Sequence, residues 1–167
     1  MQRELLDAAE KLLGDLRERK LKLVTAESCT GGLIAGYLTE IEGSADVVDR
    51  GFVTYSNEAK VELLGVPLSL IIAQGAVSAE VVRAMAEGAL VVSRAQIAVA
   101  VTGVAGPGGG TAAKPVGTIF IATARAGKPT RAAHFQFGDL KFGDLGRGGI
   151  RRRAVGAAFS MIKDIMD

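Results

Sequence analysis

Hydroxyl, thiol and glycine residues lie together in the segment Thr25-Ala26-Glu27-Ser28-Cys29-Thr30-Gly31-Gly32. It follows a short apolar run and precedes an apolar stretch with helical spacing, which predicts a turn between a strand and a helix. The first N–H groups of such a helix carry partial positive charge, and Gly31 and Gly32 would let a ligand approach them closely. The turn therefore suits an anion such as phosphate, or a serine nucleophile with an oxyanion hole. The simple alternative is a helix capped by Ser28 or Thr30.

A serine nucleophile needs a base, and the sequence offers two kinds. Its single histidine, His134, lies in an alternating strand pattern, where a structural role is the commoner one. A lysine can serve when its amine is neutral, as in Ser–Lys hydrolases. Lys60 falls in the first turn of a short predicted helix, where burial or nearby arginines could lower its pKa from about 10.4. The alternative is a solvated surface lysine.

A glycine-rich loop, Thr102-Gly103-Val104-Ala105-Gly106-Pro107-Gly108-Gly109-Gly110, follows an apolar run of strand length. Because each glycine costs conformational entropy on ordering, we interpret the loop as a backbone cradle for a ligand rather than a floppy connection. No Gly-Lys-Ser/Thr follows it, so it is not a P-loop. The loop, the Ser28 turn and the segment 54–60 each follow a predicted strand, and ligands of open α/β sheets gather beyond the carboxyl ends of strands.

Four arginines crowd the start of the last predicted helix, where cations have the wrong sign for the helix dipole. Arg147 and Arg151 are one helical turn apart, so they could reach a phosphate together. For Arg152 and Arg153 we prefer a solvated basic face. Just upstream, Phe137-Gly138-Asp139-Leu140 recurs as Phe142-Gly143-Asp144-Leu145, a local duplication in a loop.

The elements that must position these residues follow from the hydrophobic pattern. Strand–helix alternation that ends in a hairpin predicts an α/β fold, with helices on both faces of a mixed sheet. Helices are predicted at residues 2–18, 30–41, 57–64, 78–93 and 150–166, and strands at residues 21–26, 47–55, 96–101, 116–124 and 131–137.

Composition narrows the possible functions. A chain of 167 residues, 49% of them hydrophobic, predicts one domain with a sizeable core. A net charge of +2 with few aromatic residues argues against nucleic-acid binding. One cysteine and one histidine exclude an internal disulfide framework and argue against a metal site. Without a signal peptide or a run of membrane-spanning length, we expect a cytoplasmic protein, by default a homodimer.

Several segments, taken in order, resemble the CinA C-terminal family, whose characterised enzymes are nicotinamide-nucleotide amidohydrolases. The resemblance extends over about residues 5–165. The matching segments are Thr25-Ala26-Glu27-Ser28-Cys29-Thr30-Gly31-Gly32, Tyr55-Ser56-Asn57-Glu58-Ala59-Lys60, Gly75-Ala76-Val77-Ser78, Thr102-Gly103-Val104-Ala105-Gly106-Pro107 and Lys114-Pro115-Val116-Gly117.

The resemblance implies a three-layer α/β/α domain, with a mostly parallel sheet of about five strands, that deamidates nicotinamide mononucleotide without metal or cofactor. It assigns the nucleophile to Ser28 and the proton carrier to Lys60, with backbone N–H groups near Gly31 and Gly32 holding the oxyanion. We expect the substrate to be bound by residues from the turn, the glycine-rich loop and the last helix: Thr30, Gly31, Gly32, Tyr55, Thr102, Gly103, Gly106, Arg147 and Arg151.

The sequence departs from the family at one point, and one alternative function remains open. The family has a Gly-Asp-Arg run before its last helix, whereas two residues separate Asp144 from Arg147 here. The larger family proteins carry an N-terminal pyrophosphatase domain, and that activity is not expected here. The alternative function is a non-catalytic domain that binds a phosphorylated metabolite and regulates a partner, because a shared fold does not determine function.

Overall fold

The computed structural model describes residues 1–138 and 145–167, so most of the duplicated Phe-Gly-Asp-Leu segment lies outside the described residues. Helices and strands alternate in the first part of the chain and a strand hairpin precedes the last helix, as the sequence predicts. The helices are α1 (Arg3–Glu18), α2 (Leu33–Thr39), α3 (Asn57–Leu64), α4 (Leu68–Gln74), α5 (Ala79–Val91) and α6 (Gly146–Ile165), with a 3₁₀ turn η1 (Ser44–Asp46). The strands are β1 (Leu23–Glu27), β2 (Val48–Val53), β3 (Ile97–Gly103), β4 (Thr118–Arg125) and β5 (Arg131–Gln136).

One mixed sheet has the strand order β2-β1-β3-β4-β5. Strands β2, β1 and β3 run parallel, and β4 and β5 are antiparallel to their neighbours. In the parallel part, Glu27 pairs with both Val53 and Val101. The carboxyl ends of β1, β2 and β3 therefore meet at one edge of the sheet, and the candidate segments that follow them are brought together there.

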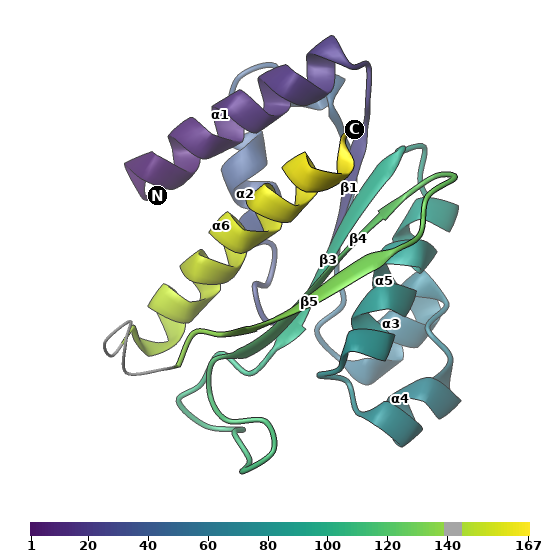
Figure 1. Ribbon diagram of the computed structural model, residues 1–167, viewed down its shortest axis with the longest axis vertical. Coiled ribbons are helices and arrows are strands. Elements are labelled where there is room, and N and C mark those ends of the chain that lie inside the picture. The colour runs from purple at the N-terminus through teal and green to yellow at the C-terminus, as the bar shows by residue number, and fades with distance from the viewer. Residues whose placement is uncertain (139–144) are drawn as a thin grey trace.

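Helices cover both faces of the sheet, which confirms the α/β fold with a mixed five-stranded sheet. Helices α1, α2 and α6 lie on one face and α3, α4 and α5 on the other (Figure 1). Helix α6 buries a stripe with helical spacing that includes Ile150, Ala154, Ala158 and Ile162. On the other face, Gly88 of α5 packs so closely on α3 that a Cβ there would lie 1.9 Å from a backbone oxygen.

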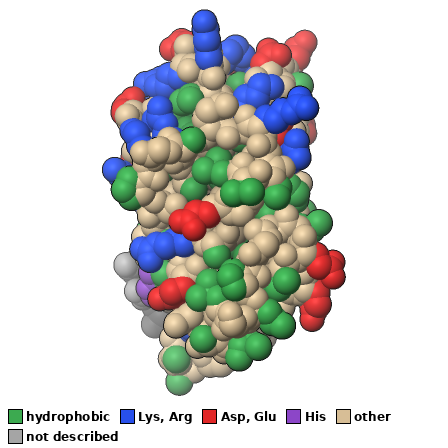
Figure 2. All heavy atoms as spheres, turned by 90° about the vertical axis from the view of Figure 1, so that its right-hand side faces the viewer, with side chains coloured by type: hydrophobic (Ala, Val, Ile, Leu, Met, Phe, Trp, Pro, Cys, Tyr) green, Lys and Arg blue, Asp and Glu red, His purple; other side chains and the backbone are tan. Residues whose placement is uncertain are grey.

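Helices α2, α4 and α6 differ from the sequence prediction. Helix α2 covers Leu33–Thr39 and is shorter than the predicted range 30–41. Helix α4 was not predicted, because Leu-Ser-Leu-Ile-Ile is short and rich in β-formers and buries only Ile71 fully. Exposed apolar residues such as Leu68 and Ile72 lie on this side of the molecule, where Figure 2 shows hydrophobic side chains reaching the surface. Helix α6 begins at Gly146, before the predicted residue 150. No helix in the described part of the chain has the length and apolarity to cross a bilayer.

Candidate active site

The structure brings the side chains of Ser28 and Lys60 together. Ser28 follows β1, and Lys60 lies on α3, whose N-cap Ser56 accepts a hydrogen bond from the Ala59 N–H. Lys60 Nζ lies 3.2 Å from Ser28 Oγ. It also donates to the backbone oxygens of Thr54, at 2.8 Å, and Ser56, at 3.4 Å. The Lys60 amine therefore contacts both the residue that follows β1, Ser28, and the residue that follows β2, Thr54.

The surroundings of Lys60 favour its neutral form. The residue is 1% exposed, which rules out the alternative of a solvated surface lysine. Burial lowers the pKa of Lys60, and this effect exceeds the opposing influence of Cys29 and Glu58. No carboxylate of the described residues forms a salt bridge with it. A neutral amine has two N–H bonds, so the two carbonyl contacts leave its lone pair for the Ser28 hydroxyl.

Glu27 shapes the turn that carries Ser28. Its buried carboxylate accepts N–H bonds from Gly32 (3.1 Å), Ile34 (3.0 Å) and Ala35 (2.9 Å) at the start of α2. The helix is therefore capped by Glu27, not by a hydroxyl of Ser28 or Thr30. The negative charge also lies where the helix dipole favours it.

The expected oxyanion hole needs a correction. The Gly32 N–H donates to Glu27, and the Gly31 N–H donates to the backbone oxygen of Ser28 at 2.9 Å. Both donors are already used, so neither is free for an oxyanion. Within the described residues, the Thr30 N–H donates to no other residue, and the Cys29 N–H contacts only its own thiol. The Thr30 N–H is therefore the donor that remains free in the turn.

Cys29 lies beside Ser28 but is a poor nucleophile. Its side chain is buried, and burial raises the pKa of the thiol to about 12. The reactive form of cysteine is the thiolate, which is scarce near neutral pH at such a pKa. The arrangement therefore favours the Ser28 hydroxyl over its neighbour.

A cavity of about 240 Å³ opens over Ser28 and Lys60. The end of β3 forms one wall, where Thr102 Oγ1 donates to the backbone oxygen of Ala76 at 2.9 Å and ties β3 to the segment before α5. Gly103 packs so tightly that a Cβ there would lie 2.4 Å from Ile119 Cδ1. The described lining residues are Ser28, Cys29, Tyr55, Asn57, Lys60, Ala76, Val77, Thr102, Gly103, Ala105 and Arg147.

The glycine-rich loop folds back on the start of β4. The Val104 N–H donates to the Thr118 oxygen at 2.8 Å, and the Gly117 N–H donates to the Val104 oxygen at 2.7 Å. Gly106 has a φ of +76°, and a Cβ there would lie 2.5 Å from a Val116 methyl group. These contacts fix the first part of the loop, next to the cavity.

The arginines of α6 reach the same region by different contacts. Arg147 lines the cavity and donates to the Gly106 oxygen and the Tyr55 hydroxyl, both at 2.8 Å. Arg151 donates to the backbone oxygens of Cys29, from Nε at 3.1 Å, and Thr30, from Nη2 at 2.8 Å. Of the predicted substrate-binding residues, Thr30, Gly31, Gly32, Gly106 and Arg151 are not among the described residues that line the cavity.

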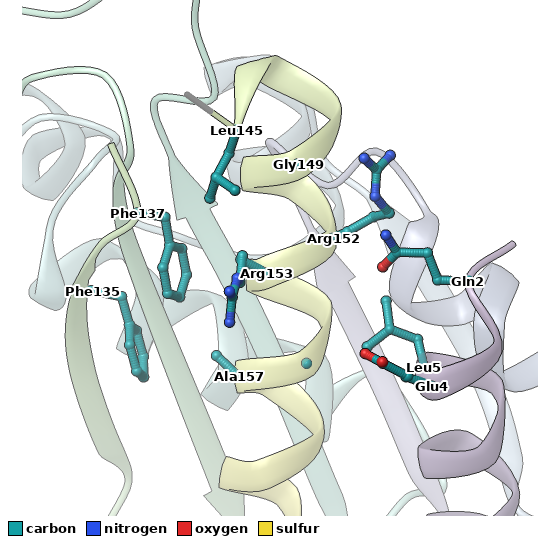
Figure 3. A pocket seen from close by; sticks show the side chains of 11 residues that line it. Gln2, Glu4, Leu5, Phe135, Phe137, Leu145, Gly149, Arg152, Arg153 and Ala157 are labelled. Atoms are coloured by element: carbon teal, nitrogen blue, oxygen red, sulfur yellow. The ribbon is translucent and has the colours of Figure 1, made fainter. Parts of the chain in front are cut away.

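A larger groove, of about 640 Å³, lies between α1, β5 and α6 and is shown in Figure 3. Its lining includes Arg152 and Arg153 of α6, Phe135 of β5, and Phe137, which directly follows β5. Its described lining contains no serine, cysteine or lysine, so it offers no nucleophile–base pair. The ring of His134 stacks on Phe120 with centroids 4.7 Å apart, and His134 is not among the described residues that line either cavity. The reactive pair therefore identifies the smaller cavity as the candidate active site.

Known proteins are similar to this chain in sequence and fold. The sequence matches the CinA C-terminal domain over residues 6–166. The chain belongs to the CinA C-terminal domain family. A CinA-like protein of Akkermansia muciniphila is 56% identical over 116 residues, which make up 70% of this chain and 28% of that protein.

Solved structures of CinA relatives agree over the whole domain. The competence/damage inducible protein CihA of Agrobacterium tumefaciens is 46% identical, with a TM-score of 0.94 over 100% of this chain and 98% of its own. The competence damage-inducible protein A (ComA) of Klebsiella pneumoniae is 32% identical, with a TM-score of 0.89 over 97% and 96% of the two chains. The chain spans only 28–35% of the length of the first curated relatives it matches.

Sequence reasoning missed two features of the site. It gave Glu27 no role, although a lone acidic residue at the end of an apolar strand and before a helix start is a recognisable capping signal. It also missed the carbonyl partners of Lys60 at Thr54 and Ser56. No pattern in the sequence marks a backbone oxygen as a lysine partner, because the contact depends on how α3 returns toward β1.

Proposed function

We propose that the chain is an amidohydrolase that converts nicotinamide mononucleotide and water to nicotinate mononucleotide and ammonia. One observation carries the proposal: Ser28 Oγ lies 3.2 Å from the amine of a lysine that is 1% exposed. This is the nucleophile–base geometry of covalent catalysis with a lysine base. Membership of the CinA family and its implied activity supply the substrate.

The reaction would begin when Lys60 takes the Ser28 proton and Oγ bonds to the carboxamide carbon. When the resulting tetrahedral intermediate collapses, the C–N bond breaks and Lys60 returns the proton to the departing nitrogen, which leaves as ammonia. In the second half, Lys60 takes a proton from water as the water oxygen bonds to the ester carbon. When the bond to Ser28 Oγ breaks, Lys60 returns that proton to Oγ, and the product acid releases its proton to solvent as nicotinate. The same lysine acts as base and acid in turn.

The oxyanion of each intermediate needs donors that are free in the resting protein. Gly31 and Gly32 are engaged elsewhere and the Cys29 N–H contacts its own thiol, so we assign this role to the Thr30 N–H, in the turn that follows the nucleophile. Helix α2 is short and already capped by the Glu27 carboxylate. Stabilisation of the oxyanion therefore depends on direct hydrogen bonds rather than on the helix dipole.

The size of the cavity suits one end of the substrate. Sites that enclose drug-sized ligands hold about 300–1,000 Å³, whereas this cavity holds about 240 Å³. We infer that the nicotinamide ring enters it, beside Tyr55 and Thr102, while the ribose phosphate remains at the rim. Arg147 is the cation at that rim, so we assign the phosphate contact to it.

Ammonia release tests the proposal directly. Purified protein incubated with nicotinamide mononucleotide should release ammonia and nicotinate mononucleotide in equal amounts. A matched reaction with nicotinate mononucleotide, which has no carboxamide, should release none. If the protein binds the nucleotide but releases no ammonia above the enzyme-free rate, the amidohydrolase proposal is refuted and the regulatory alternative takes its place.

A further inference from the structure

Arg151 contacts the backbone of the Ser28 turn at two adjacent peptides. Its side chain leaves α6, whose neighbouring residues Ile150 and Ala154 are buried against the sheet. One edge of the guanidinium donates to the Cys29 oxygen from Nε, at 3.1 Å, and to the Thr30 oxygen from Nη2, at 2.8 Å. Such two-point contacts fix orientation as well as distance, because the guanidinium is planar and its donors form a rigid fork.

These contacts fix the direction of the N–H groups as well. A trans peptide is planar, so its C=O and N–H point in opposite directions. When Arg151 holds the Cys29 oxygen, it turns the N–H of Thr30, which belongs to the same peptide, away from α6. The Thr30 oxygen shares its peptide with the Gly31 N–H, which is directed to the Ser28 oxygen at 2.9 Å.

The Thr30 N–H is the donor that this arrangement leaves available. Within the described residues it donates to no other residue. Cys29 lines the cavity over Ser28, whereas Arg151 is not among the described lining residues. The Cys29 carbonyl is held toward Arg151, so the opposite end of the same peptide, the Thr30 N–H, points away from α6, next to Cys29, which lines the cavity.

We propose that Arg151 is a positioning residue that holds the Cys29–Thr30 peptide so that the Thr30 N–H binds the oxyanion formed by Ser28. This role rests on the proposed amide hydrolysis. It replaces the phosphate contact expected for Arg151 from the sequence, because Arg151 contacts two carbonyls of the turn and, unlike Arg147, is not among the described residues that line the cavity. Gly31 leaves room for the Arg151 guanidinium, since a Cβ added at Gly31 would lie 3.3 Å from Arg151 Nη2.

Steady-state kinetics on two substrates test the role. An oxyanion donor acts only when charge develops, so its loss lowers kcat and leaves KM nearly unchanged. We expect Arg151→Met to lower kcat by about 10²- to 10³-fold, the usual effect of losing one oxyanion donor. The factor should be the same for nicotinamide mononucleotide and nicotinamide riboside, which lacks the phosphate. Arg151→Lys should lose at least about tenfold, because an ammonium cannot reproduce the planar fork.

The matched control is Arg153→Met, which removes an exposed arginine from the same helix and should keep kcat within about twofold. Melting temperatures show that each variant is folded, and Arg151→Lys decides the matter if Arg151→Met does not fold. An unchanged kcat in the Arg151 variants overturns the role, as does a loss confined to the phosphorylated substrate. If the wild type itself releases no ammonia, the proposed function fails; if it turns over and the Arg151 variants match it, only the positioning role fails.

Discussion

The carboxylate of Glu27 should contribute strongly to the stability of this domain, and Glu27→Gln measures that contribution. Oε2 accepts the N–H bonds of Gly32 and Ile34, and Oε1 accepts that of Ala35. A glutamine has one carbonyl oxygen, so its amide can keep the first two bonds but turns an NH₂ group toward the Ala35 N–H. The substitution is nearly isosteric and changes only charge and hydrogen bonding.

The expected loss follows from those contacts. A hydrogen bond to a charged group contributes about 1.5–3 kcal/mol, and loss of a negative charge at a helix start costs about 0.3–1 kcal/mol. Together they predict a decrease of about 2–4 kcal/mol in the free energy of unfolding. For a domain of this size, each kcal/mol shifts Tm by about 2–4 °C, so Tm should fall by about 4–16 °C. Because the weakened turn carries Ser28, kcat should fall as well.

Urea and thermal unfolding of the wild type and two variants provide the test. Glu80→Gln is the matched control, since Glu80 is an exposed acidic residue in the first turn of α5 and makes only the dipole contribution. We expect Glu80→Gln to cost less than about 1 kcal/mol. If Glu27→Gln destabilises the protein no more than Glu80→Gln does, the argument that three N–H bonds converge on this carboxylate is refuted.

Three further predictions concern catalysis. Lys60→Arg should be nearly as inactive as Lys60→Ala, because arginine keeps the charge but cannot accept a proton. Wild-type activity should rise with pH through the lowered pKa of Lys60. Full activity in Lys60→Arg, or a flat pH profile, would contradict the assignment of Lys60 as the base. Nicotinamide riboside should have a kcat/KM at least about tenfold lower than that of the nucleotide, which corresponds to about 1.4 kcal/mol of transition-state stabilisation, and Arg147→Ala should reduce this preference. Equal kcat/KM values for the two substrates would contradict the proposed phosphate contact. Chelators should leave activity unchanged, because the described residues contain no cluster of ligands for a metal ion; activity lost in chelator and restored by a divalent metal argues against the mechanism.

The sequence predicts the framework of the site better than its hydrogen bonds. Short apolar runs locate the strands, and parallel order brings the ends of β1, β2 and β3 to one edge, where Ser28, Lys60 and Thr102 converge. Pairing Ser28 with Lys60 itself relied on resemblance to the CinA family. Local sequence alone favoured a solvated surface lysine, because burial of Lys60 depends on tertiary packing around α3.

The unpredicted features share one cause. Sequence reasoning assigned no role to Glu27 and predicted a phosphate contact for Arg151. In the structure, both side chains bind the backbone of the turn around Ser28. Periodicity shows which face of an element is buried, but it does not show which backbone group a long side chain reaches. The free donor of the turn, and therefore the position that we propose for the oxyanion, becomes apparent only when those contacts are counted.

The central claim is that Ser28, and not its neighbour Cys29, attacks the carboxamide. The most direct measurement is the rate of ammonia release from nicotinamide mononucleotide by the wild type, Ser28→Ala and Cys29→Ala, with Tm as the check on folding. Because burial raises the pKa of Cys29 to about 12, we expect Cys29→Ala to retain activity and folded Ser28→Ala to lose it. Turnover by Ser28→Ala within tenfold of the wild type, or an inactive but folded Cys29→Ala beside an active Ser28→Ala, would contradict the account.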